Sequence, residues 1–189
     1  MIHDIPAVIF AGGKSSRMGK DKALLPFGGY DSLVEYQYAK LQKLFNDVYI
    51  SAKNDKFDFN ANVIYDTYTI NSPLGAIISV LEYTQRPTFI LSVDAPFVDE
   101  DIIQKLISKY ENSSIATVAQ TKDGLQPLCA IYNLSFVPKA KVQFQNGNHK
   151  INYILKNENI TSVFFEDDNK FLNVNYPKDY QKALEYDTI

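Results

Sequence analysis

The sequence predicts an α/β fold, a three-layer open sandwich in which helices cover both faces of a mostly parallel mixed sheet. Short apolar runs alternate with amphipathic segments of roughly 10 to 14 residues, the pattern of strand–helix–strand units. Thr88–Val93 is apolar and β-branched and lies between Pro87 and Pro96, as is typical of a central buried strand. The first strand runs directly into a glycine-rich segment, residues 11–19. Ligands of such sheets bind beyond the carboxyl ends of the strands, so a site is expected there.

The first half of the chain contains three expected strands and two expected helices. Ile5–Phe10 is a short apolar run that predicts a buried strand. Ser32–Phe45 places its apolar residues close to the 3.6-residue period, which predicts an amphipathic helix. Strands are expected at Asp47–Ser51 and Val63–Tyr65, and a helix that begins with a proline at Pro73–Thr84.

The second half is expected to continue the alternation after the strand Thr88–Val93. Asp99 is a suitable N-cap for a helix that ends near Tyr110. The turn signal Lys122-Asp123-Gly124 separates two further strands. The remaining expected elements are strands at Ile115–Ala119, Leu128–Tyr132 and Ser162–Phe165 and helices at Phe136–Phe144, His149–Leu155 and Pro177–Glu185.

Size and charge limit the classes of protein to consider. The chain has 189 residues, 46% of them apolar, and no linker or repeat, which predicts one domain over residues 1–189. Its net charge of −3 argues against nucleic acid or an anionic membrane as a partner. No apolar run approaches the roughly 20 residues of a membrane span. Asp4 and Pro6 interrupt any secretory signal, so a cytoplasmic location is expected.

Few residues are available for soft-metal or thiol chemistry. Cys129 is the only cysteine, which excludes an intrachain disulfide and a multi-thiolate metal centre. His3 and His149 are the only histidines. A metal cofactor would therefore be a hard cation held by oxygen atoms, which indicates Mg²⁺.

The glycine-rich segment is the strongest functional signal. Five of the eight glycines lie within 18 consecutive positions: Gly12, Gly13, Gly19, Gly28 and Gly29. Residues 11–22 also carry Lys14, Arg17, Lys20 and Lys22 against one acid, Asp21, a local charge of +3. Converging backbone amides and cations are what a polyphosphate requires, although a solvated loop with ordinary turn glycines is the alternative. The spacing matches neither the dinucleotide fingerprint nor a Walker loop.

The run FAGGKSSRMGKDKALL, residues 10–25, resembles the signature of the molybdenum cofactor guanylyltransferase (MobA) family of nucleotidyltransferases. Three later segments match that family in order: SPLG at 72–75, DAPF at 94–97 and NVNYP at 173–177. The resemblance spans nearly the whole chain. It implies a Rossmann-like fold similar to that of the nucleotide-diphospho-sugar transferases.

The resemblance also implies an activity and a set of site residues. It implies magnesium-dependent transfer of GMP from GTP to the terminal phosphate of the molybdenum–molybdopterin cofactor, with release of pyrophosphate. The implied catalytic residues are Arg17, Lys22 and Asp94, with Asp94 as the metal ligand. The implied nucleotide-binding residues are Phe10, Ala11, Gly12, Gly13, Lys22, Asp66 and Asp94. Partners would be GTP, molybdopterin and proteins of molybdenum-cofactor biosynthesis or the receiving molybdoenzyme.

Three polar residues also have simpler interpretations. Asp94 follows a predicted strand, where its carboxylate can face the phosphates through a divalent ion, or it is only a turn residue before Pro96. Asp66 either contacts the nucleoside, as in the similar family, or orders an Asx turn. Asn175 either adds an oxygen to the metal or to the second substrate, or orders the turn before a helix.

Some positions depart from the family pattern. Ser72 stands where a glycine commonly begins the segment, and Gly75-Ala76 reverses the usual order. Lys53 replaces an asparagine that often contacts the nucleotide, and a lysine cannot accept a hydrogen bond from the base. A cytidylyltransferase, a sugar-phosphate nucleotidyltransferase and a non-catalytic nucleotide- or molybdopterin-binding partner protein are therefore the alternatives.

Overall fold

A computed structural model of the chain describes residues 3–13, 19–68 and 72–187. Within these residues, seven strands form one sheet in the order β3-β2-β1-β4-β6-β5-β7. The strands are β1 (Ala7–Phe10), β2 (Val48–Ala52), β3 (Val63–Tyr65), β4 (Thr88–Ser92), β5 (Ala116–Thr121), β6 (Gly124–Tyr132) and β7 (Thr161–Phe164). Neighbours among β1 to β4 pair in parallel, whereas β6 runs antiparallel to β4 and β5. The predicted mostly parallel mixed sheet is confirmed.

The helices are α1 (Leu33–Gln42), α2 (Pro73–Thr84), α3 (Glu100–Ser108), α4 (Phe136–Gln145), α5 (Ile151–Asn157) and α6 (Pro177–Asp187), with short 3₁₀ turns η1 (Lys22–Leu24) and η2 (Asp168–Phe171). The predicted cap at Asp99 is confirmed, since its carboxylate accepts from the Ile102 amide at 3.1 Å. Helix α1 ends three residues earlier than predicted because Leu44 and Phe45 leave the helix to pack in the core. The sequence patterns do not predict the two 3₁₀ turns.

Strand β6 is longer than predicted, and its extra residues matter for the site. It begins at Gly124 instead of Leu128, because its pairing with β5 continues up to the turn at Lys122 and Asp123, where Thr121 pairs with Gly124. The register between the two strands then shifts at Val118 and Ala119, a bulge opposite Pro127, which has no amide hydrogen to offer the ladder. The bulge aims residues 127–129 towards the edge of the sheet where the predicted site lies.

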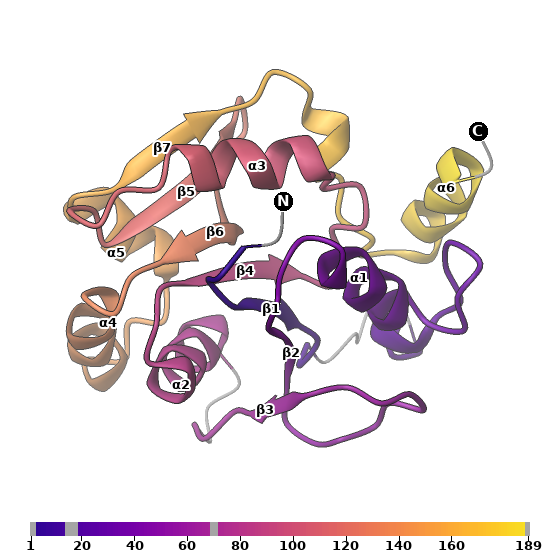
Figure 1. The fold of residues 1–189 in the computed structure, drawn as a ribbon, viewed down its shortest axis with the longest axis horizontal. Coiled ribbons are helices and arrows are strands. Elements are labelled where there is room, and N and C mark those ends of the chain that lie inside the picture. The colour runs from indigo at the N-terminus through magenta and orange to yellow at the C-terminus, as the bar shows by residue number, and fades with distance from the viewer. Residues whose placement is uncertain (1–2, 14–18, 69–71, 188–189) are drawn as a thin grey trace.

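Helices cover both faces of the sheet, which gives the three layers that the sequence predicts (Figure 1). Alternate residues of β1 separate the two cores: Ala7 and Ile9 face one side, and Val8 and Phe10 face the other. Buried residues of α1, α3 and α6 complete the first core, and those of α2, α4 and α5 complete the second. Every residue of β1 is buried, so the glycine-rich segment starts from a rigid support.

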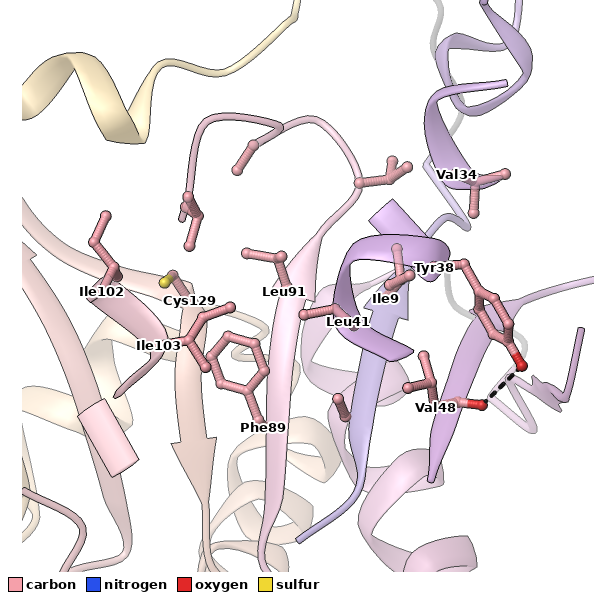
Figure 2. Packing of buried hydrophobic residues seen from close by; sticks show 14 of the residues in the cluster. Ile9, Val34, Tyr38, Leu41, Val48, Phe89, Leu91, Ile102, Ile103 and Cys129 are labelled. Carbon is pink, nitrogen blue, oxygen red and sulfur yellow. Dashed lines mark hydrogen bonds between the residues drawn. The ribbon is translucent and has the colours of Figure 1, made fainter. Parts of the chain in front are cut away.

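The first core is packed with aliphatic and aromatic side chains between the sheet and α1 and α3 (Figure 2). The rings of Phe45 and Phe89 stack with their centroids 5.5 Å apart. Tyr38 keeps its hydroxyl satisfied by donating to the Val48 carbonyl at 3.3 Å. Burial of each large apolar side chain stabilises the fold by about 1.5–3 kcal/mol. Within the described residues, none of the helices has the length and apolar character that crossing a bilayer would need.

Candidate functional site

A cavity of about 210 Å³ lies beyond the carboxyl ends of β1, β2, β3 and β4, where the sequence places the ligand. The sheet order brings these four ends together at one edge. The start of α2 closes the cavity through Ser72, Pro73 and Ala76. The predicted site residues in its wall are Phe10, Gly12, Gly13, Lys22, Asp66 and Asp94.

Two predicted site residues are not part of this wall as the structure describes it. Ala11 is 1% exposed and is absent from the residues that line the cavity. Its amide donates to the Ser51 carbonyl at 3.0 Å, which continues the pairing of β1 with β2. Ala11 thus supports the wall from behind instead of facing a ligand with its side chain. Arg17 lies outside the described residues, so its place in the site stays a prediction.

Lys22 and Asp94 are in direct contact, although 72 positions separate them in the sequence. Their side chains are each 14% exposed. The Lys22 ammonium also donates to Asn175 Oδ1 at 3.0 Å, and the Ser92 hydroxyl donates to Asp94 Oδ1. The Asp94 carbonyl accepts from the Val174 amide at 2.8 Å, which ties the segment before Asn175 to the end of β4. Lys22, the last cation of the basic segment, therefore lies directly against the aspartate at the end of β4.

The oxygen atoms around Lys22 suit a hard cation. A carboxylate oxygen of Asp94 and the amide oxygen of Asn175 converge on one ammonium group. In the described part of the chain, no group of three or more His, Cys, Asp or Glu residues could hold a metal unaided. Mg²⁺ usually takes one or two protein carboxylates and completes its shell with phosphate oxygens and water. The donor set fits that ion in combination with a bound polyphosphate.

Asp66 orders an Asx turn and also lies in the cavity wall, while its contact with a nucleoside stays a prediction. Its Oδ1 accepts from the Tyr68 amide at 3.0 Å, which is an Asx turn, and from the Ser79 hydroxyl at 3.2 Å. The same residue lines the cavity at the end of β3. Asn175 makes two different contacts. Its backbone amide donates to the Asp179 carboxylate at 3.2 Å, and its side-chain oxygen accepts from Lys22.

Two glycines of the glycine-rich cluster serve another purpose. Gly28 and Gly29 have φ angles of +60° and +75° and form a tight turn between Phe27 and Tyr30, whose backbones bond to each other. Neither glycine lines the cavity. Although they are close to residues 11–22 in sequence, Gly28 and Gly29 belong to a separate turn that precedes α1. Gly12 and Gly13 do line the cavity, as predicted.

A second hollow of about 230 Å³ adjoins the cavity and shares Ser92, Asp94 and Leu128 with it. The bulged part of β6 and the segment before α6 form its other walls, with Gln126, Phe171 and Asn173 among the lining residues. Asp94 is thus common to two neighbouring hollows. The sequence does not predict this second hollow, because most of its lining residues come from segments without a recognisable motif.

The segment that follows Asp94 is held from behind by α1. Lys40 donates to the carbonyls of Pro96 at 2.9 Å and Val98 at 2.8 Å, and Gln37 donates to the Ala95 carbonyl at 2.9 Å. Burial lowers the pKa of Lys40 to about 7, against weaker opposing effects of Cys129 and Asp99. The periodicity of this helix predicts only an apolar face and gives no sign of these polar contacts.

An open α/β sheet with a cavity beyond the carboxyl ends of its parallel strands is an arrangement typical of nucleotide-binding enzymes. A family model described as "MobA-like NTP transferase domain" matches residues 7–160. The chain belongs to this family and is a nucleotidyltransferase.

Named relatives and solved structures agree with this assignment. A protein of Campylobacter jejuni subsp. doylei named molybdenum cofactor guanylyltransferase is 34% identical to this chain, and the match covers 96% of each. A protein of the same name from Helicobacter pylori J99 is 33% identical, and the match covers 98% of this chain and 90% of the relative. Molybdopterin-guanine dinucleotide biosynthesis protein A from Archaeoglobus fulgidus superposes with a TM-score of 0.84 at 20% identity, over 97% of this chain and 99% of that one. A 2-C-methyl-D-erythritol 4-phosphate cytidylyltransferase from Thermus thermophilus gives 0.73 at 13% identity, over 99% and 100%. These two structures show the shared fold.

Proposed function

We propose that the protein transfers GMP from GTP to the terminal phosphate of the molybdenum–molybdopterin cofactor and forms molybdopterin guanine dinucleotide. The names of the relatives that match 96% of the chain support this choice of substrates. The contact between Lys22 and Asp94 in the wall of one cavity is the structural observation that carries it. A cation and a carboxylate able to hold a metal ion, side by side in one cavity, are groups that can stabilise the charge that develops in nucleotidyl transfer.

In this reaction an oxygen of the acceptor's terminal phosphate attacks the α-phosphorus of GTP. A new P–O bond forms as the bond from the α-phosphorus to the bridging oxygen breaks, and its electron pair leaves with pyrophosphate. The attacking phosphate is already ionised at neutral pH, so the protein needs no activated serine or cysteine. Its contribution is to position the two substrates and to neutralise the charge of the phosphates.

Each site residue has a role that its position supports. Gly12 and Gly13 let the backbone approach the phosphates, and Lys22 supplies positive charge beside them, with Arg17 as its sequence-predicted counterpart. Asp94 and Asn175 would hold Mg²⁺, which would supply positive charge that favours the departure of pyrophosphate. Asp66 lies at the end of β3, away from the Lys22 pair, and would contact the nucleoside.

The second hollow is the proposed place of the acceptor. It shares Asp94 with the nucleotide cavity, so an acceptor phosphate there would lie next to the metal-binding carboxylate. Gln126 and Asn173 offer hydrogen-bonding groups, and Phe171 offers an aromatic surface to a planar ring system. This arrangement keeps the two substrates on different sides of one catalytic group.

The test is a turnover assay with GTP, CTP, ATP and UTP, each with molybdopterin and Mg²⁺, followed by pyrophosphate release. We expect GTP to be used at least tenfold faster than the other nucleotides. Fastest turnover with CTP would support the cytidylyltransferase alternative, and turnover with a sugar phosphate in place of molybdopterin would support a different acceptor class. Nucleotide binding without pyrophosphate release would indicate a non-catalytic binding protein.

Lys53 offers a sharper test of base selection. It lines the cavity at the end of β2, where it cannot accept a hydrogen bond from a base. In Lys53→Asn an amide group replaces the ammonium group. The amide can both donate a hydrogen bond to the edge of the base and accept one from it. If position 53 contacts the base, the ratio of GTP to CTP turnover changes in this variant, whereas Lys43→Met, on the exposed end of α1, leaves the ratio unchanged.

A further inference from the structure

Lys56 lies between β2 and β3, in a segment that no motif covers. It contacts Ala11, the first residue of the glycine-rich segment, and Asp21, which follows two residues after that segment ends. Its ammonium donates to the Ala11 carbonyl at 3.2 Å and forms an ion pair with Asp21. Ala11 immediately follows β1, and Asp21 immediately precedes η1. One side chain therefore joins the point where the glycine-rich segment leaves the sheet to the point where it returns to regular structure.

Asp21 connects this ion pair to the residues of the site. It is the N-cap of η1, where its Oδ1 accepts from the Ala23 amide at 3.1 Å while its Oδ2 meets Lys56. The next residue, Lys22, reaches Asp94 and Asn175. The orientation of η1, and with it the direction of the Lys22 side chain, depends on the cap that Asp21 forms.

The pair also has an electrostatic consequence. Asp21 is the only acid in residues 11–22, beside the lysine that the proposed function assigns to the phosphates. An unpaired carboxylate there would repel a polyphosphate, and water would screen this repulsion less than at a fully exposed position because the side chain is 30% exposed. Lys56, itself 20% exposed, is the cation that cancels this charge.

We propose that Lys56 is a positioning residue of the nucleotide site, which joins Ala11 to Asp21 and neutralises Asp21. The inference rests on the proposed function insofar as the ligand is a nucleoside triphosphate. Lys56 itself does not line the cavity, so it acts through Ala11, Asp21 and Lys22. A partly exposed ion pair with no such role would affect the stability of the fold slightly and ligand binding not at all.

The experiment measures the affinity of GTP with Mg²⁺ by calorimetry for four variants of the full chain. Lys56→Met removes both contacts and keeps an unbranched side chain that is only one heavy atom shorter. We expect it to raise the dissociation constant for GTP about tenfold. In the turnover assay, we expect KM to rise by a larger factor than kcat falls. Lys56→Arg retains a cation at the same place, and we expect its affinity to stay within about threefold of the unmodified protein.

A double variant that removes both charges of the ion pair separates an effect of charge on GTP binding from an effect on folding. Asn can still accept from the Ala23 amide, so Asp21→Asn retains the cap and removes the charge. We expect Asp21→Asn combined with Lys56→Met to bind GTP more tightly than Lys56→Met does. Lys43→Met on the exposed end of α1 is the matched control, with unchanged affinity.

Two results would overturn the proposal: unchanged affinity in Lys56→Met, or a loss of affinity that Asp21→Asn does not relieve. A change in melting temperature with unchanged affinity would equally overturn it, since it would leave Lys56 with a structural role only. If the unmodified protein binds none of the four nucleoside triphosphates, the proposed function fails first and takes this inference with it. If it binds one and Lys56→Met binds it equally well, only this inference fails.

Discussion

The Lys22 ammonium contacts the Asp94 carboxylate across the carboxyl edge of the sheet, and Asn175 completes the contact from the segment before α6. Three regions that are far apart in sequence thus meet at Lys22, which lies in the cavity wall. A carboxylate that is mostly buried is stable only with partners that compensate its charge. Each charge of the pair therefore compensates the other, and in the proposed function both would act on the bound nucleotide.

Replacement of Asp94 by Asn should remove most of the activity and leave the fold intact. The amide keeps the shape of the side chain and can still accept from the Ser92 hydroxyl, but it loses the charge that would hold Mg²⁺. We expect kcat for pyrophosphate release to fall by about 100-fold or more, in line with the loss of one electrostatic group from an active site. Asp123→Asn in the exposed β5–β6 turn is the control. Magnesium-dependent release at the unmodified rate would exclude the proposed role.

The buried Lys40 should make stability depend on pH. Its pKa is lowered from 10.5 to about 7 in the folded state, so between pH 7 and 10.5 the unfolded chain binds more protons at this group than the folded one. Stability therefore rises with pH in this window, by at most about 1.4 kcal/mol per pH unit, and the cost of burying the charge is fully present below pH 7.

This dependence can be isolated by a difference measurement. Urea unfolding of the unmodified protein and of Lys40→Met at pH 6, 7, 8 and 9 cancels the contributions of all other groups that titrate equally in both. We expect the unmodified protein to gain stability relative to the variant above pH 7. A difference in unfolding free energy between the two proteins that stays constant from pH 6 to 9 would contradict the lowered pKa of Lys40. As a control, we expect the difference between the unmodified protein and Lys43→Met not to change with pH over this range.

Gly28 and Gly29 should differ in their tolerance of alanine. Both have positive φ angles, so a Cβ at either position costs about 1–2 kcal/mol through the backbone. A Cβ at Gly28 would also clash with the ring of Tyr36, whereas one at Gly29 meets nothing within 4 Å. We expect Gly28→Ala to destabilise the fold by about 1–3 kcal/mol more than Gly29→Ala, since overpacking adds to strain. Equal denaturation midpoints for the two variants would contradict the close approach of the Tyr36 ring to Gly28.

Cys129 should be inert towards thiol reagents in the folded protein. It is 3% exposed, and burial raises the pKa of its thiol to about 12, so the reactive thiolate is scarce at neutral pH. We expect labelling by a disulfide reagent at pH 8 to be at least 100-fold slower than in 6 M guanidinium chloride. Labelling at the denatured rate would show that β6 opens readily near the second hollow.

Local patterns in the sequence were sufficient for most of the elements. Pro73 and Pro177 begin helices where predicted, and Val63–Tyr65 forms a strand with the predicted bounds. Six of the eight residues predicted for the site line one cavity, because residues that follow parallel strands emerge at the same edge of the sheet. These predictions depended on local residue preferences, such as proline at the start of a helix, and on the shared direction of parallel strands.

The sequence by itself determined the alternation of strands and helices, the glycine-rich turn after β1 and the position of Asp94 at a strand end, since each follows from propensities and caps within a few residues. Only the tertiary structure decided that β6 lies between β4 and β5, that Asn175 joins Lys22, and that Lys56 pairs with Asp21. The two side-chain contacts join segments 35 or more positions apart. Their formation depends on how two cores pack against one sheet, which no short pattern of residues records.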